Sequence, residues 1–253
     1  MGSLVGKVAL VTGAGQGVGQ GIALALATEG ADVAVVGRTA AKLETTCELL
    51  VERGVRAVPF VCDITETSTI PATVAQVVET MGGVDILVNN AYSGAYGPLL
   101  TIDDEAVERS FASGPFATLA FMKACHPHFV ARGGGHIVNL VTSAMVRWDP
   151  TTYGVYAAAK QAVRALTRTA AVEWARDGIR ANSIAPHALS PGLKWWTEQN
   201  PEEAEEFVAA IPMGRIGDCE LDIGRAVVAL LGEDMRYLTG ATIPLDGGQA
   251  FFG

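Results

Sequence analysis

Tyr156 and Lys160 are two side chains that could together move a proton. They lie four residues apart in a segment whose apolar residues recur at helical spacing, which predicts that both occupy one face of a helix. A phenol ordinarily titrates at roughly pH 10, and a cation fixed beside it favours the phenolate. The pair could therefore exchange a proton with the oxygen of a carbonyl or an alcohol. Such spacing is common by chance, so its meaning depends on the motifs around it.

A hydroxyl side chain could hold the oxygen that receives this proton. Ser143 lies thirteen residues before Tyr156, just after an apolar run, Ile137 to Val141, that is typical of a buried strand. In open α/β sheets ligands bind beyond the carboxyl ends of the strands, which is where Ser143 is expected. Thr142 is its rival, and we favour Ser143 because of its distance along the chain from Tyr156.

A glycine-rich turn follows the first apolar run and precedes an amphipathic helix. Gly13, Gly17 and Gly19 in the segment T-G-A-G-Q-G-V-G would let the backbone turn sharply and approach a pyrophosphate. The amides at the start of the next helix direct partial positive charge at such an anion. Glycine clusters also occur in purely structural turns, but this strand-turn-helix context favours a dinucleotide site that includes Gln16 and Val18.

The residues after the second apolar run indicate which dinucleotide is bound. An acidic side chain there normally binds the ribose hydroxyls of NAD, whereas an arginine suits the 2′-phosphate of NADP. This chain carries Gly37-Arg38 and no acid. A guanidinium can grip a phosphate with two hydrogen bonds, so NADP(H) is favoured over NAD(H). The alternative is that Arg38 points into solvent beside Lys42.

These residues require a framework of alternating strands and helices. Apolar runs without alternation are typical of strands buried on both faces of a parallel sheet, and the longer amphipathic segments between them supply crossover helices. We therefore predict a doubly wound (Rossmann) α/β fold, with a mainly parallel seven-stranded sheet and helices on both faces. The seven predicted strands are Val8 to Val11, Val33 to Val36, Val58 to Val61, Ile86 to Val88, Ile137 to Val141, Ala181 to Ile184 and Thr242 to Leu245.

No linker, charge block or repeat divides the chain, which predicts one domain over residues 1–253. Residues 187–216 are an exception within it. Prolines punctuate this stretch around a short acidic helix, Glu202 to Ala210, so we interpret it as an excursion that covers the substrate.

Composition excludes several classes of function. The formal net charge of -9 disfavours binding to nucleic acid or to anionic membrane surfaces. No apolar run approaches the ~20 residues that span a bilayer, and no export signal is apparent at the start of the chain. The four cysteines contain no C-x-x-C pair, which favours a reducing cytoplasm. His126 and His128 lack a carboxylate or thiol cluster, so we expect a structural role and no metal site.

From Lys7 to Gly248 the sequence resembles the short-chain dehydrogenase/reductase family. The resemblance implies hydride transfer with a nicotinamide cofactor, in which Tyr156 is the acid/base, Lys160 also binds the nicotinamide ribose and Ser143 orients the carbonyl. It implies a homotetramer as well. The matching motifs are the glycine turn, Asp63 at the adenine, Asn89-Asn90-Ala91, Tyr156 with Lys160, Thr239-Gly240 and Asp246-Gly247-Gly248; Ile64, Pro186, His187 and Leu189 are further expected cofactor contacts.

The chain departs from the family pattern near the expected reaction centre. Tyr92 replaces the signature glycine after Ala91, and His187 replaces the glycine after Pro186. Gly114 stands where the family usually carries an asparagine that anchors a water relay, and Pro115 should kink the helix there. A kink exposes carbonyls that could hold the water instead. The segment from Asn139 to Tyr156 is one residue longer than is commonest in the family.

His187 has three open interpretations: a substrate ligand, a supplementary acid, or a loop residue that faces solvent. Tyr153 is expected in the pocket wall, because no lysine follows it at helical spacing. Large apolar side chains in loops after strands favour a hydrophobic ketone or secondary alcohol as substrate. Trp195 and Trp196 could equally pack the excursion onto the domain or onto another subunit. The full set of pocket candidates is Tyr92, Tyr96, Met145, Trp148, Leu189, Trp195 and Trp196.

Two functions from different classes follow. The first is reversible hydride transfer between NADP(H) and a hydrophobic carbonyl or alcohol, carried by Ser143, Tyr156 and Lys160. The second is a dinucleotide-binding sensor or interaction protein of the same fold with little turnover, for which the altered Tyr92 and Gly114 would be markers. Tyr156 and Lys160 favour the enzyme, because a pure binder does not need them.

Overall fold

The protein was analysed as a computed structural model, which describes residues 2–147 and 152–252. Its centre is a seven-stranded sheet in the order β3-β2-β1-β4-β5-β6-β7, with every neighbouring pair parallel. The doubly wound fold predicted from the sequence is confirmed. The strands are β1 (Val8–Thr12), β2 (Asp32–Gly37), β3 (Ala57–Val61), β4 (Ile86–Asn89), β5 (Gly135–Leu140), β6 (Ile179–Pro186) and β7 (Thr242–Leu245).

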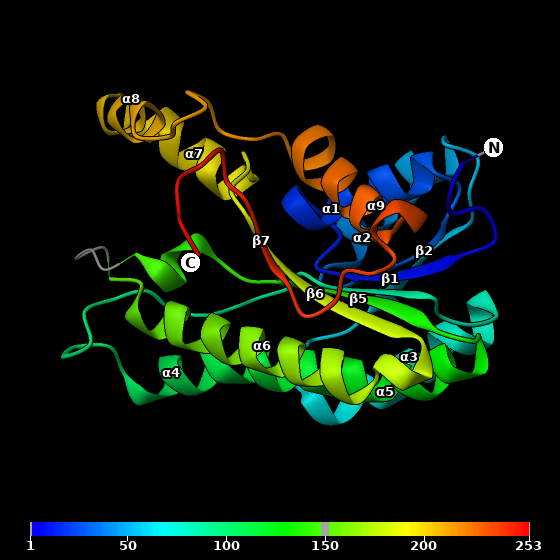
Figure 1. Cartoon of the computed structure of the whole chain (residues 1–253). Coiled ribbons are helices and arrows are strands. Elements are labelled where there is room, and N and C mark those ends of the chain that lie inside the picture. Colours follow the sequence, from blue (N-terminus) through cyan, green and yellow to red (C-terminus); the bar gives the residue numbers. More distant parts are fainter. Residues whose placement is uncertain (1, 148–151, 253) are drawn as a thin grey trace.

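Helices cover both faces of this sheet, as Figure 1 shows. One face carries α1 (Gly17–Thr28), α2 (Ala40–Val51) and α9 (Arg225–Leu231), and the other carries α3 (Ile70–Met81), α4 (Asp104–Phe111), α5 (Ala117–Ala131) and α6 (Gly154–Glu173). No helix in the described part of the chain is both long and apolar enough to span a membrane. Short helical turns lie at Thr67–Thr69, Ala112–Phe116, Ser143–Val146, Ala175–Asp177, Cys219–Gly224 and Glu233–Met235.

The strands differ in burial according to their place in the sheet. All residues of β1 and β4 are buried, as continuous apolar runs predict. The edge strands differ from the prediction of burial on both faces: β7 is only partly buried, and in β3 Val61 is 64% exposed. An edge strand lacks a neighbour on one side, so the adjoining helices cover less of it. Residues at the ends of the central strands β1 and β4 therefore lie in a more fully buried part of the sheet than those of the edge strands.

The excursion over residues 187–216 contains two helices, α7 (Pro191–Gln199) and α8 (Pro201–Ala209). The sequence predicted the second to within a residue at each end but missed the first. Proline is favoured at the first helical position, where its missing N–H costs nothing, so Pro191 and Pro201 begin helices here. Ser190 caps α7 by accepting a hydrogen bond from the Leu193 amide.

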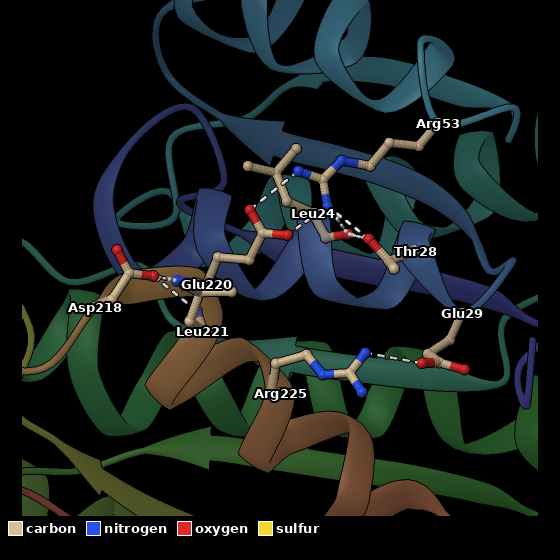
Figure 2. Close-up of polar contacts among 8 residues, drawn as sticks. All are labelled: Leu24, Thr28, Glu29, Arg53, Asp218, Glu220, Leu221 and Arg225. Carbon is tan, nitrogen blue, oxygen red and sulfur yellow. Dashed lines mark hydrogen bonds and ion pairs between the residues drawn. The ribbon is translucent and has the colours of Figure 1, made fainter.

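The chain that leaves the excursion is fixed to α1, the helix that follows the glycine turn (Figure 2). Asp218 accepts hydrogen bonds from the amides of Glu220 and Leu221, which starts the next helical turn. Arg53 reaches from the end of α2 to bind both Glu220 and the Leu24 carbonyl of α1. These contacts hold the segment that follows the excursion against α1, which begins at the glycine turn.

Candidate active site

The glycine turn connects β1 to α1 at the carboxyl edge of the sheet. Gly13 and Gly17 have positive φ angles of 67° and 60°, which favour glycine. A side chain at Gly19 would collide with the Asn90 amide, so the backbone needs glycine there as well. That amide donates hydrogen bonds to the carbonyls of Thr12 and Gly13, at 2.9 and 3.2 Å. Asn90 therefore fixes the conformation of the turn through these two hydrogen bonds.

A cleft of about 500 Å³ begins at this turn and runs to Tyr156. Ten of the predicted cofactor residues line it: Gly13, Gln16, Gly17, Val18, Arg38, Asp63, Ile64, Asn90, Ala91 and Tyr156. Gly19 and Lys160, which were also predicted, do not line the cleft. The structure adds lining residues that the sequence reasoning did not assign: Gly15, Gly37, Thr39, Leu43, Cys62, Ser93, Ser190, Pro191 and Gly192, together with Lys42, Tyr92 and Tyr96, which it had considered in other roles.

Two cations lie at the far end of the cleft from Tyr156. Arg38 Nη1 is 4.0 Å from Asp63 Oδ2, and more than half of its side chain is exposed. Lys42 Nζ donates a 2.6 Å hydrogen bond to Gln16 Oε1. The Thr65 amide donates to Asp63 and lowers the pKa of that carboxyl. Position could have revealed Lys42, because it lies in the first turn of α2, just after Arg38.

Tyr156 lies at the inner end of the cleft among other aromatic rings. Its ring centroid is 5.1 Å from that of Tyr92 and 5.4 Å from that of Tyr96. Burial raises the pKa of the Tyr156 phenol, the nearby Tyr96 adds to the rise, and a hydrogen bond with Thr142 opposes it. This differs from our expectation that Lys160 lowers the pKa toward neutrality. Without a group bridging the two side chains, burial dominates and the phenol keeps its proton.

Lys160 is buried behind Tyr156 on the same face of α6. Its Nζ donates a 2.8 Å hydrogen bond to the Leu140 carbonyl, at the end of β5. The ammonium lies 6.0 Å from the centre of the Tyr156 ring. Burial lowers the pKa of Lys160 to about 8. The spacing of four residues therefore brings the two side chains together as predicted from the helix.

The two candidate hydroxyls after β5 point in different directions. Ser143 Oγ donates a 2.6 Å hydrogen bond to Asp246 Oδ2 in the C-terminal motif. The Thr142 hydroxyl lies near enough to the Tyr156 phenol to oppose the rise in its pKa, and Thr142 Oγ1 accepts a hydrogen bond from the Ala144 amide at 3.2 Å. The preference for Ser143 therefore differs from the geometry, which brings Thr142 to the phenol.

The helix at Pro115 is broken, as the sequence predicted. Residues 112–116 form a wide helical turn between α4 and α5, in which Gly114 has the non-helical angles φ -88° and ψ -105°. Ser113 Oγ accepts a hydrogen bond from the Ser93 amide and donates to the Ser93 carbonyl. The kink thus joins this turn to the loop that carries Tyr92.

Three of the expected cofactor contacts do not line the cleft: Pro186, His187 and Leu189. His187 instead lines a second cavity of about 430 Å³ together with Asp246, and its ring packs edge-on against Phe207. Both ring nitrogens are shielded from water, so the interpretation that His187 faces solvent is wrong. Burial lowers the pKa of His187, which keeps the ring neutral.

The pocket candidates divide into three groups. Tyr92 and Tyr96 line the cleft, and Tyr153 packs edge-on against Tyr96. Trp196 contacts Phe207 within the excursion, whereas Trp195 is 63% exposed. Met145 differs from the expectation, because it is buried in a small core cluster. Trp148 lies outside the described residues.

His126, for which the sequence predicts a structural role, pairs with Asp177 on the surface.

The cleft fits an elongated dinucleotide. Positive φ angles at Gly13 and Gly17 and the absence of a side chain at Gly19 leave the start of α1 open to a pyrophosphate. Arg38 and Lys42 lie at the end of the cleft where the adenosine would be held. Tyr156 lies at the opposite end, where a reacting ring would meet a substrate oxygen.

Fold and site together define a dinucleotide-binding α/β protein with a Tyr and Lys pair beside a hydroxyl. A family model described as enoyl-(acyl carrier protein) reductase matches residues 13–250. A 12alpha-hydroxysteroid dehydrogenase of a Clostridium species is 37% identical over 258 residues, with 98% of each chain covered.

Solved structures give the same result. The L-sorbose reductase of Gluconobacter frateurii, complexed with NADPH and L-sorbose, has a TM-score of 0.90 at 30% identity and covers 98% of each chain. A 7alpha-hydroxysteroid dehydrogenase complexed with NADH and 7-oxo glycochenodeoxycholic acid has a TM-score of 0.91 at 30% identity, covering 98% of this chain and 95% of that one. The chain belongs to the short-chain dehydrogenase/reductase family and is an oxidoreductase.

Proposed function

We propose that this oxidoreductase transfers a hydride between NADP(H) and a hydrophobic ketone or secondary alcohol. The observation that carries the proposal is the meeting of Tyr156, Lys160 and Thr142 at the inner end of the cleft that starts at the glycine turn. A hydride carrier bound there supplies or accepts the hydride at its nicotinamide ring. The chain's own residues must hold the substrate oxygen and move its proton.

Each of these residues has a separate task. Tyr156 keeps its proton in the buried site, which is the form that donates to a carbonyl oxygen during reduction. Thr142 can donate to the same oxygen, because accepting from the Ala144 amide leaves its own hydroxyl proton free. Lys160, fixed by the Leu140 carbonyl, supplies the positive charge that stabilises the phenolate left behind. In oxidation the same groups act in reverse.

The charges at the adenosine end favour NADP(H). Arg38 and Lys42 lie on the same side of the cleft as Asp63, which is their one acidic neighbour among the lining residues that the structure describes. A 2′-phosphate would give both cations an anionic partner and would displace Arg38 from its long contact with Asp63. Of the two related structures described above, the L-sorbose reductase holds NADPH and the 7alpha-hydroxysteroid dehydrogenase holds NADH, so the side chains of this cleft carry the proposed preference.

Replacing Arg38 by alanine is expected to weaken NADPH binding by about 10- to 100-fold, because charged hydrogen bonds of about 1.5–3 kcal/mol are lost. NADH binding should change by less than about threefold, since NADH lacks the phosphate. Fluorescence titration of both cofactors measures the effect. Arg236→Ala, at an exposed site on the surface, is the matched control. Equal losses for both cofactors would contradict the assignment.

The residues around Tyr156 support a hydrophobic substrate. Tyr92, Tyr96 and Tyr153 form an aromatic wall around the phenol, and such rings bury large apolar groups well. The hydroxysteroid dehydrogenases among the relatives agree with this proposal, whereas the L-sorbose reductase acts on a polar sugar. A panel of steroid, aryl and alicyclic ketones and of ketoses, followed by NADPH absorbance, tests it. Turnover confined to ketoses would reject the hydrophobic class.

The excursion and the assembly are part of the proposal. The single domain would be closed over its substrate by α7 and α8, because Ser190, Pro191 and Gly192 at the start of α7 line the cleft. A cytoplasmic homotetramer is proposed from the family resemblance. Light scattering of the purified protein measures the assembly, and a stable monomer would reject this part alone. Tight NADPH binding without turnover on any ketone or alcohol would favour the sensor.

A further inference from the structure

Tyr92 lies between three elements of the candidate site. Its ring packs on the Tyr156 ring, with centroids 5.1 Å apart. The Lys160 ammonium lies over its face, 4.8 Å from the centroid. On a third side, a Cβ atom at Gly114 would lie 3.5 Å from Tyr92 Cε2. One side chain therefore contacts both members of the proton-transfer pair and the kinked turn at Gly114.

The buried ammonium of Lys160 depends on few partners. Its Nζ donates a hydrogen bond to the Leu140 carbonyl, and its nearest aromatic face is that of Tyr92. A buried cation is costly unless other groups compensate the lost water. The negative face of an aromatic ring does so, most strongly where water is excluded. The Tyr92 ring thus gives the ammonium a second partner besides the Leu140 carbonyl.

The hydroxyl of Tyr92 has no comparable role. It is buried and meets no hydrogen-bond partner among the described residues. The Ser110 hydroxyl lies near enough to oppose the rise that burial causes in the pKa of Tyr92, but no hydrogen bond joins the two groups. A buried hydroxyl without a partner costs stability. Ring and hydroxyl can therefore be separated by mutation.

Gly114 and Tyr92 occupy neighbouring space. An alanine at position 114 would make ordinary contacts with Tyr92 and Ala159, but a longer side chain would meet the Tyr92 ring. The ring fills the space that a side chain at this turn would otherwise take. The two positions therefore form a matched pair, in which the small residue permits the large one.

We propose that Tyr92 is a positioning residue that holds Lys160 through its ring face, and that the ring limits position 114 to a small side chain. This inference rests on the proposed function, since it assigns Tyr92 a task in the same proton transfer. It predicts that the aromatic face, and not the hydroxyl, matters for the reaction.

The kinetic test compares Tyr92→Phe with Tyr92→Leu in the alcohol oxidation direction. Tyr92→Leu should lower kcat/KM about tenfold, because the cation loses its aromatic partner. Because a loosened ammonium stabilises the Tyr156 phenolate less, the pKa of Tyr156 should rise in this variant. The pH at which the oxidation rate reaches half of its maximum should therefore be higher than in the wild type. Tyr92→Phe should keep the wild-type midpoint and at least a third of kcat/KM. Tyr237→Leu, at a fully exposed tyrosine, controls for the substitution itself.

The structural test needs no turnover. Gly114→Asn should lower the Tm by about 5 °C in the wild-type chain, because it overpacks against the ring. The same substitution in Tyr92→Ala should change the Tm by less than about 2 °C, since the space is then open. Tyr92→Phe should not lower the Tm, because the hydroxyl it removes has no partner.

The outcomes separate this inference from the proposed function. An active wild-type enzyme in which Tyr92→Phe and Tyr92→Leu lose the same activity with an unshifted pH midpoint would overturn the positioning role. Equal Tm losses from Gly114→Asn with and without the Tyr92 ring would overturn the matched pair. A wild-type chain that binds NADPH but reduces no ketone would reject the proposed function, and the Tm comparison would still test the pair.

Discussion

Tyr156→Phe is expected to lower kcat by about 10²- to 10⁴-fold, which is the usual contribution of a positioned acid or base. The phenol is the buried proton donor at the end of the cleft, and phenylalanine keeps its ring contacts with Tyr92 and Tyr96. The NADPH dissociation constant should change by less than about threefold. Steady-state kinetics and a fluorescence titration on the same preparation measure both quantities.

The fold must survive for this result to be informative. Removing the Tyr156 hydroxyl keeps the ring and its contacts with Tyr92 and Tyr96, so the Tm should fall by only a few degrees. Tyr153→Phe is the matched control, because Tyr153 belongs to the same aromatic group and is partly exposed. A Tyr156→Phe enzyme that retains more than a tenth of the wild-type kcat would show that another group moves the proton.

Thr142→Val is expected to lower kcat by about 10²- to 10³-fold, since it removes a donor to the substrate oxygen. Valine has nearly the shape of threonine, so the loss measures the hydroxyl. Thr142→Ser should restore most of the activity, because serine carries the hydroxyl at the same place. The measurement is kcat with a ketone that the wild-type enzyme reduces.

Ser143→Ala separates the two neighbouring hydroxyls. It breaks the 2.6 Å hydrogen bond to the buried Asp246 carboxylate, which should cost about 1–3 kcal/mol of stability. Its kcat should fall by less than about tenfold, because Ser143 faces the C-terminal motif. If Ser143→Ala loses more activity than Thr142→Val, the assignment of Thr142 is wrong.

The framework could be predicted from the sequence because its signals are local. Continuous apolar runs mark the central strands, and the glycine turn marks the start of α1 by its position between a strand and a helix. The spacing of Tyr156 and Lys160 predicts their shared face, because a helix has a fixed period. The edge strands were less well predicted, since their burial depends on how far the neighbouring helices extend.

The orientation of single side chains in loops could not be predicted this way. Counting back from Tyr156 favoured Ser143, but the segment is one residue longer than usual and the count does not show where the extra residue lies. Only the end of β5 fixes that position, and it brings Thr142 to the phenol. Likewise, the burial of His187 depends on Phe207 in the excursion, a contact between distant parts of the chain.

Transfer of deuterium from 4-deuterated NADPH to a hydrophobic ketone tests the central claim most directly. The wild-type enzyme is incubated with the ketone panel and each labelled cofactor epimer, and the alcohols are analysed by mass spectrometry. We expect one epimer to place deuterium on the carbinol carbon. We also expect Tyr156→Phe, with cofactor bound, to yield almost no labelled alcohol. Bound NADPH that labels no alcohol, or deuterium found in water instead, would contradict it.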